Sequence, residues 1–235
     1  MQAELSQTPT VPLIPGLDLT AFMNFASNPS NTQSILDVQK GLLAAPNRAQ
    51  MAQWIIKAIG DSDFQHLLNE RYSPEFPTNA QLQACPENSL GRALVKHLTA
   101  NNIQLDFAGL DLSMFYGKEL SPIAYFGIRS LRIHDILHTV LGLGVTALDE
   151  YFIASFTLAQ YHSAYHMLLI SSGFMHMTFH DPENVPKFIE GIMRFYNLGL
   201  KAKFVTGYRF EDNFATPLAE IRRELNLHEL LADKN

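Results

Sequence analysis

The chain has 235 residues and a mass of 26.4 kDa, a length that suits one domain with a sizeable buried core. Charged residues make up only 17% of the chain and the net charge is −6, which argues against nucleic acid as a partner. The one cysteine, Cys85, excludes an internal disulfide framework and a four-thiolate zinc site.

The beginning of the sequence matches no targeting signal. Residues 1–16 contain no basic residue and no long apolar run, and they include Glu4. No segment reaches the ~18 consecutive apolar residues that a membrane-spanning helix needs. We therefore expect a cytoplasmic protein, with peripheral contact to a membrane left open.

The first thirty residues are expected to form an irregular arm, because four prolines stand among scattered serine, asparagine and threonine residues. From Asn31 onward, apolar residues recur at helical spacing, and no alternating run is long enough to demand a sheet. The sequence therefore predicts an all-α protein. It would be a single-domain helical bundle over residues 31–235, preceded by an irregular N-terminal arm over residues 1–30.

Capping residues, prolines and glycines set the expected helix boundaries. Ser89 is a candidate N-cap, and Thr146 followed by Asp149 three places later matches a capping box. The expected helices cover about residues 31–45, 51–60, 64–68, 89–102, 121–141, 146–172, 182–199 and 217–231.

Histidines four residues apart lie on one face of a helix. Three such pairs occur: His134 and His138, His162 and His166, His176 and His180. In the first pair, Asp135 follows His134 at about 100° around the helix, so three potential ligands span roughly a quarter-turn. Imidazoles and a carboxylate suit zinc, ferrous iron or manganese. The alternative is two structural histidines, with Asp135 paired to Arg132.

Glu150 is the candidate for a further ligand from a second helix. On one straight helix it would lie ~24 Å from His134, which is out of reach. Gly142 and Gly144 interrupt the helical pattern, and Thr146 can begin a new helix. The chain can therefore double back and return Glu150 to the level of the histidines, as in metal sites shared by two helices of a bundle.

This motif resembles the signature of the coenzyme Q biosynthesis protein four family. The signature is matched without a gap by His134-Asp135-x-x-His138, then eleven residues, then Glu150. Further agreement with the family pattern is found at Tyr125, Arg129, Gly142 and Leu90-Gly91. The likeness covers roughly residues 33–225.

The chain departs from that family pattern beside the motif. Arg132 stands where many members carry an acidic residue. Ile136 and Leu137 stand where they carry two aromatic residues. These departures line the candidate site, so they bear on the substrate more than on membership.

The resemblance implies an all-helical, peripheral membrane protein that acts in the biosynthesis of ubiquinone or a related polyprenyl quinone. His134, Asp135, His138 and Glu150 would hold a divalent ion, with zinc expected and magnesium, iron or manganese as alternatives. Family members have been assigned oxidative removal of a ring carboxylate with hydroxylation at that carbon. The implied enzyme is a metal-dependent decarboxylase and hydroxylase of a prenylated aromatic ring, with Arg129 as a second, catalytic anion contact.

The same resemblance implies partners. Family members bind polyprenyl lipids, organise the other quinone-biosynthesis enzymes and lie on a membrane surface, which is the matrix side of the mitochondrial inner membrane in eukaryotes. A homodimer is also expected. For Arg129, the alternative is a solvated helix charge or a partner of Asp135.

Composition independently favours a long-chain lipid as ligand, since sixteen phenylalanines and eight methionines suit an adaptable apolar cavity. The candidate lipid-binding residues stand among small residues and are Phe152, Phe156, Ala159, His162, Ser163 and His166. Close helix packing is the alternative for the apolar members of this set. For the two histidines, the alternatives are support of the metal site or a plain structural role.

Two other functions stay open. A phosphohydrolase that uses a His-Asp doublet would need His97 and Asp181 at the site and would leave Glu150 without a part. A lipid-presenting scaffold would carry a structural metal closed by four protein ligands, whereas a catalytic metal keeps one position open. The sequence contains neither an aspartate-rich prenyl diphosphate motif nor a glycine-rich nucleotide loop.

Overall fold

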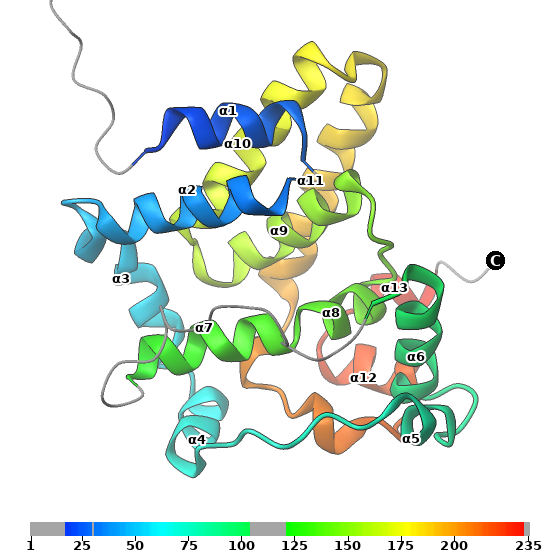
Figure 1. The fold of residues 1–235 in the computed structure, drawn as a ribbon. Coiled ribbons are helices and arrows are strands. Elements are labelled where there is room, and N and C mark those ends of the chain that lie inside the picture. Colours follow the sequence, from blue (N-terminus) through cyan, green and yellow to red (C-terminus); the bar gives the residue numbers. More distant parts are fainter. Residues whose placement is uncertain (1–16, 30, 104–120, 233–235) are drawn as a thin grey trace, which may run out of the picture.

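A computed structural model describes residues 17–29, 31–103 and 121–232 (Figure 1). Within these ranges the chain is built of α-helices and short 3-10 helices, and the prediction of an all-α fold is confirmed. The helices of the first half are α1 (Leu19–Ser27), α2 (Thr32–Ala44), α3 (Arg48–Ala58), α4 (Ser62–Glu70), α5 (Asn79–Gln83) and α6 (Leu90–Asn101). The expected Ser89 cap is present, because the Ser89 hydroxyl accepts a hydrogen bond from the Arg92 N–H at 3.2 Å.

The second half contains longer helices and the last short ones. They are α7 (Pro122–Arg132), α8 (His134–Leu141), α9 (Ala147–Tyr161), α10 (Ala164–Phe179), α11 (Val185–Lys201), α12 (Leu218–Glu224) and α13 (Glu229–Ala232). The 3-10 helices are η2 (Pro182–Asn184), η3 (Val205–Gly207) and η4 (Phe210–Asn213). None of the helices described is long and apolar enough to cross a membrane.

The prediction of an irregular arm over residues 1–30 is wrong for residues 19–27, which form α1. The Asp18 carboxylate caps this helix by accepting the Ala21 N–H at 2.9 Å. Phe22 and Phe25 are buried, and α1 packs against α2 and α10 (Figure 1). The prolines that suggested an arm lie outside the helix, and residues 1–16 and 30 lie outside the described residues.

Three predicted long helices are each divided in two. α7 and α8 meet at Ile133, whose N–H still bonds the Arg129 carbonyl at 3.1 Å. His162 ends α9 in the left-handed region at a φ of 49°, and Asn226 separates α12 from α13 at a φ of 60°. Apolar spacing continues across such breaks, because the residues on both sides still face the core.

The centre of the molecule is the pairing of α9 with α11 (Figure 1). Gly191 and Gly199 of α11 lie against Phe152 and Phe156 of α9, where a Cβ atom would have no room. The main apolar core joins α6, α8, α9, α11 and α12. This arrangement holds α8 beside the first turn of α9, which is where the predicted metal ligands lie.

Candidate metal centre

A tight turn returns the chain from α8 to α9. Gly142 ends α8 at a φ of +73°, a left-handed conformation that L-residues other than glycine seldom adopt. The Thr146 hydroxyl donates to the Asp149 carboxylate at 2.6 Å, and the Asp149 N–H donates back to the Thr146 oxygen at 3.3 Å. This capping box, which the sequence predicted, fixes the start of α9 and places Glu150 in its first turn.

The side chains of His134, His138 and Glu150 form a triangle of potential ligands. His134 Nε2 and His138 Nε2 are 3.2 Å apart. Glu150 lies 3.4 Å from His134 Nε2 through Oε2 and 3.3 Å from His138 Nε2 through Oε1. Around a tetrahedral zinc ion, bonds of about 2.0–2.1 Å separate neighbouring ligand atoms by about 3.3 Å. The donor set and its spacing therefore fit a first-row divalent ion.

Asp135 is not part of this triangle. The group of potential ligands that the structure brings together consists of His134, His138 and Glu150. A residue next to His134 points about 100° away around the helix, whereas His138 returns to within about 40°. Asp135 does not pair with Arg132 either: the Arg132 guanidinium lies 3.9 Å from the Glu211 carboxylate and donates to the Pro74 carbonyl.

The cluster is open on one side. The side chain of His138 is only 1% exposed, whereas those of His134 and Glu150 are 44% and 46% exposed. A structural metal is usually closed off by four protein ligands, whereas a catalytic metal keeps one position open to water or substrate. Three ligands with an exposed edge match the second arrangement.

Electrostatics within the cluster favour an ionised glutamate. Burial opposes the charged form of Glu150, but hydrogen bonds from His134 and His138 outweigh it and hold the pKa of the carboxyl well below its usual range. Burial also opposes a charged His134, but the hydrogen bond and charge of Glu150 prevail and raise the pKa of this imidazole. At neutral pH the cluster therefore presents one carboxylate anion to any ion that binds.

His97 of α6 lies behind His138. The two rings stack with centroids 5.6 Å apart and planes at 17°. His97 Nε2 and His138 Nδ1 are both buried, and neither has a hydrogen-bond partner among the described residues. Spacing gave no reason to select His97, because it lies 41 residues before His138 in the sequence. Asp181, which the phosphohydrolase interpretation needs, is not in the ligand group and instead accepts from Asn184.

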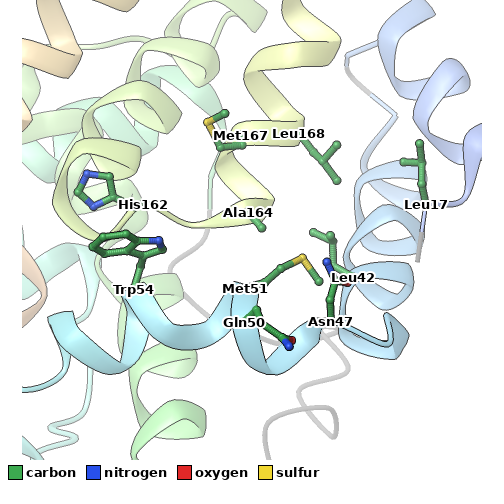
Figure 2. Close-up of a pocket in the computed structure, with 10 residues that line it drawn as sticks. All are labelled: Leu17, Leu42, Asn47, Gln50, Met51, Trp54, His162, Ala164, Met167 and Leu168. Carbon is green, nitrogen blue, oxygen red and sulfur yellow. The ribbon is translucent and has the colours of Figure 1, made fainter. Parts of the chain in front are cut away.

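An apolar pocket lies beside the first turn of α10. Ala164, Met167 and Leu168 of this turn line a pocket of about 510 Å³ (Figure 2). His166 of the same turn does not line it, and burial, with a contribution from His134, lowers the pKa of this imidazole to about 3, so it is neutral. The Trp54 ring of α3 lies in the same pocket, with its centroid 5.3 Å from that of His162.

Of the six predicted lipid-binding residues, the structure places His162 in this pocket. Phe152, Phe156 and Ala159 are buried and pack against the glycines of α11, which is the close helix packing that stood as the alternative. Ser163 is buried at the start of α10, outside the lining of the pocket. The sequence did not single out most of the lining as lipid-binding, namely Leu17, Leu42, Asn47, Gln50, Met51, Trp54 and Met167.

Arg129 lies on the buried side of α7. Its side chain is 1% exposed, forms an ion pair with Glu211 of η4 and donates to the Tyr208 carbonyl at 2.6 Å. It is neither a solvated charge nor a partner of Asp135. Glu211 was missed at the sequence level, because no local pattern shows that residue 211 returns to α7.

Comparison with known proteins gives one consistent family. Residues 44–230 match the family model described as coenzyme Q (ubiquinone) biosynthesis protein Coq4. The ubiquinone biosynthesis protein COQ4 homolog, mitochondrial, of Rattus norvegicus is 28% identical over 148 residues, which is 63% of this chain and 54% of the relative. The human homolog is 30% identical, in a match that covers 52% of this chain and 54% of the relative.

A solved structure shares the fold. It is the crystal structure of a putative ubiquinone biosynthesis protein from Nostoc punctiforme, with a TM-score of 0.72 and 23% identity, covering 90% of this chain and 96% of that one. The chain spans about half the length of the curated relatives that it matches.

Proposed function

The chain belongs to the coenzyme Q (ubiquinone) biosynthesis protein Coq4 family, and we propose that it is a metal-dependent enzyme in the biosynthesis of ubiquinone or a related polyprenyl quinone. The reaction would be oxidative decarboxylation with hydroxylation of a prenylated aromatic acid. The observation that carries the proposal is the open triangle of His134, His138 and Glu150, in which the two Nε2 atoms are 3.2 Å apart and each lies 3.3–3.4 Å from one oxygen of the Glu150 carboxylate.

In this proposal, His134, His138 and Glu150 hold a divalent ion, with zinc expected. The ion supplies Lewis-acid stabilisation of negative charge on a substrate carboxylate or phenolate. Glu150 stays ionised, because its two histidine partners lower its pKa, and so reduces the net charge of the ion. Because the side chains of His134 and Glu150 are partly exposed, the head group of the substrate can reach the ion from solvent.

The pocket beside α10 is the proposed place for the polyprenyl tail. Trp54, Met51 and Met167 supply a wide apolar surface, and methionine adapts its shape to flexible chains (Figure 2). Neighbouring residues of a helix point about 100° apart, so His166, whose pKa His134 lowers, and Met167 of the pocket would direct head group and tail to different sides of the first turn of α10.

A membrane surface and the other quinone-biosynthesis enzymes are the proposed partners, and a homodimer is the proposed assembly. Large apolar side chains are exposed on α10 and α11, including Phe179 at 72%, Met193 at 61% and Leu200 at 56%. Such residues favour peripheral contact with lipid or protein. The proposed location is peripheral on the membrane at which the quinone is made.

The proposed reaction is tested with a prenylated aromatic acid labelled at its carboxyl carbon, supplied with the zinc-loaded protein, water as the source of the hydroxyl oxygen, and molecular oxygen as the two-electron acceptor that becomes hydrogen peroxide. We expect labelled carbon dioxide together with a ring hydroxylated at the vacated carbon. Loss of both histidine ligands removes charge stabilisation in the transition state. The rate of carbon dioxide release by the His134→Ala/His138→Ala variant should therefore be at least about 100-fold lower than that of the native protein. His180→Ala, an exposed histidine of no ligand group in the structure described, is the matched control. Zinc and lipid binding without carbon dioxide release would instead favour the scaffold.

The tail site is tested by introducing charge into the pocket. We expect Met51→Asp/Met167→Asp to retain at least about tenfold less long-chain lipid than the native protein, because a carboxylate in the lining would lose its hydration when an apolar ligand covers it. Organic extracts of the purified proteins are compared by mass spectrometry. Ile56→Asp/Ile123→Asp adds the same two charges at exposed positions outside the pocket and should leave the lipid content unchanged. Equal lipid in all three proteins would contradict the pocket as the tail site.

A further inference from the structure

Two arginines share one carboxylate on the buried side of α7. Arg129 and Arg132 are three residues apart, which places them on neighbouring positions of one helix face. Glu211 pairs with Arg129, and its Oε1 lies 3.9 Å from Arg132 Nε. The three side chains are only 1%, 14% and 2% exposed, in the order Arg129, Arg132, Glu211. This buried group therefore has more positive than negative charge.

Both guanidinium groups also have an unused donor. The Nε atoms of Arg129 and Arg132 are buried and have no hydrogen-bond partner among the described residues. The hydrogen bonds of Arg129 go to Glu211 and the Tyr208 carbonyl, and Arg132 donates to the Pro74 carbonyl. A buried charged donor without an acceptor costs free energy, so such donors are normally satisfied by a ligand, an ion or water.

The surrounding acidic groups that the structure describes do not supply the missing charge. Glu70 and Asp212 both pair with Arg209, and Asp212 also accepts the Tyr72 hydroxyl at 2.9 Å. Glu211 Oε2 is buried and unpaired, but it belongs to the carboxylate that already serves Arg129. Burial and repulsion by Arg129 lower the pKa of Arg132 despite the attraction of Glu211, so that single carboxylate does not compensate both cations.

A cavity of about 170 Å³ lies at these groups. Its lining includes Arg71, Arg129, Arg132, Tyr72, Tyr125 and Ser73. Arg71 is exposed, and no ion pair joins it to any residue of the part of the chain that the structure describes. None of the lining residues belongs to the His134, His138 and Glu150 cluster.

We propose that this cavity binds a phosphate group, either as the free ion or as the end of a phosphomonoester, held by Arg71, Arg129 and Arg132. Three guanidinium groups and one carboxylate leave two positive charges, which a phosphate dianion balances. The planar fork of arginine matches the geometry of phosphate oxygens, and charge-assisted hydrogen bonds of this kind are the strong ones. The volume holds such a group but leaves no room for a polyprenyl chain, so any ester carries its remainder outside the cavity.

The site is tested on the metal-free protein, so that failure of the zinc site and failure of this site are separate results. Inorganic phosphate is titrated in the presence of a chelator while the Nε–H signals of the arginines are followed by NMR. We expect a Kd of about 1 mM and shifts of the Arg129 and Arg132 signals. Arg71→Gln and Arg132→Gln should each weaken binding by about tenfold, because each removes a charge-assisted contact.

Two control variants distinguish specific recognition of phosphate by a planar guanidinium group from nonspecific attraction by positive charge. Arg223→Gln removes an exposed guanidinium from α12, outside the cavity, and should leave the Kd unchanged. Arg132→Lys keeps the charge but loses the fork, and should bind more weakly than the native protein. Arg129 is not substituted, because its loss would leave the buried Glu211 carboxylate without its ion-pair partner and would destabilise the fold.

The source of the phosphate is distinguished by a second probe, phenyl phosphate. Binding tighter than that of inorganic phosphate identifies a phosphomonoester as the ligand, and equal binding identifies the free ion. The proposal is overturned if neither probe binds, if both variants bind as well as the native protein, or if His134→Ala/His138→Ala abolishes binding.

Discussion

Glu150→Gln will bind zinc at least about 100-fold more weakly than the native protein. The substitution keeps the size of the side chain but removes the only carboxylate in the triangle of ligand atoms. Loss of an anionic ligand leaves two neutral imidazoles, which are too few for a stable site on their own. Zinc affinity is measured by competition with a chromophoric chelator, and the metal content of the purified protein is measured in parallel.

The pH dependence of zinc binding gives a second readout of the same site. Zinc needs neutral imidazoles, and Glu150 raises the pKa of His134 above its ordinary value of about 6.5. Affinity should therefore be full above this raised pKa and should fall by about tenfold per pH unit below it, as one proton competes with the ion. In Glu150→Gln the carboxylate that raises the pKa is absent, so the fall should begin at lower pH.

Asp135→Asn decides between the four-ligand set implied by the family motif and the three ligands that the structure brings together. Because Asp135 lies outside the triangle, we expect its amide variant to retain zinc affinity within about threefold. A loss as large as that of Glu150→Gln would show that Asp135 rotates into the site when the ion binds. His228→Ala, an exposed histidine of the last turn before α13, controls for general loss of imidazole.

The parts of this site that were predictable are those encoded by local sequence. The spacing of His134 and His138 fixes their common face, Gly142 fixes the turn, and the Thr146 capping box fixes the start of α9. Together, the turn and the capping box place Glu150 near the two histidines, which a straight helix could not do. The site could therefore be predicted from the local sequence, without knowledge of how the rest of the chain packs.

The parts that were not predictable depend on contacts between distant segments. Glu211 pairs with Arg129, which is 82 residues away in the sequence, and His97 stacks on His138, which is 41 residues away. No local sequence pattern indicates either contact. The tail pocket is similar, since Trp54 comes from α3 and Met167 from α10. The small residues of α9 suggested room for a lipid, but the same pattern serves close helix packing, and only the partner helix decides between the two.

Gly199→Ala will lower the free energy of unfolding by about 2–3 kcal/mol, and Gly199→Val by more. A Cβ atom at position 199 would lie 2.4 Å from the Phe156 carbonyl oxygen and 2.9 Å from the Ala159 Cβ. The first contact is with backbone, which cannot turn aside as a flexible side chain can. Helix propensity acts in the opposite direction and favours alanine by about 1 kcal/mol, so any net loss reports the steric contact.

The loss is measured as a shift of the urea unfolding midpoint and as a fall of about 5–10 °C in Tm. Leu200→Ala, at the next and exposed position, should change stability by less than about 0.5 kcal/mol. Unchanged or greater stability of Gly199→Ala would mean that α9 and α11 do not approach so closely in solution.

Gly199→Ala also tests whether the packing of α9 against α11 affects zinc binding by Glu150. Gly199 lies against Phe156 and Ala159 in the later turns of α9, whereas Glu150 stands in its first turn, which Thr146 caps independently. The folded fraction of Gly199→Ala should therefore bind zinc within about threefold of the native affinity. If zinc affinity instead falls together with stability, then α11 positions Glu150 through α9, and the capping box alone does not hold the site.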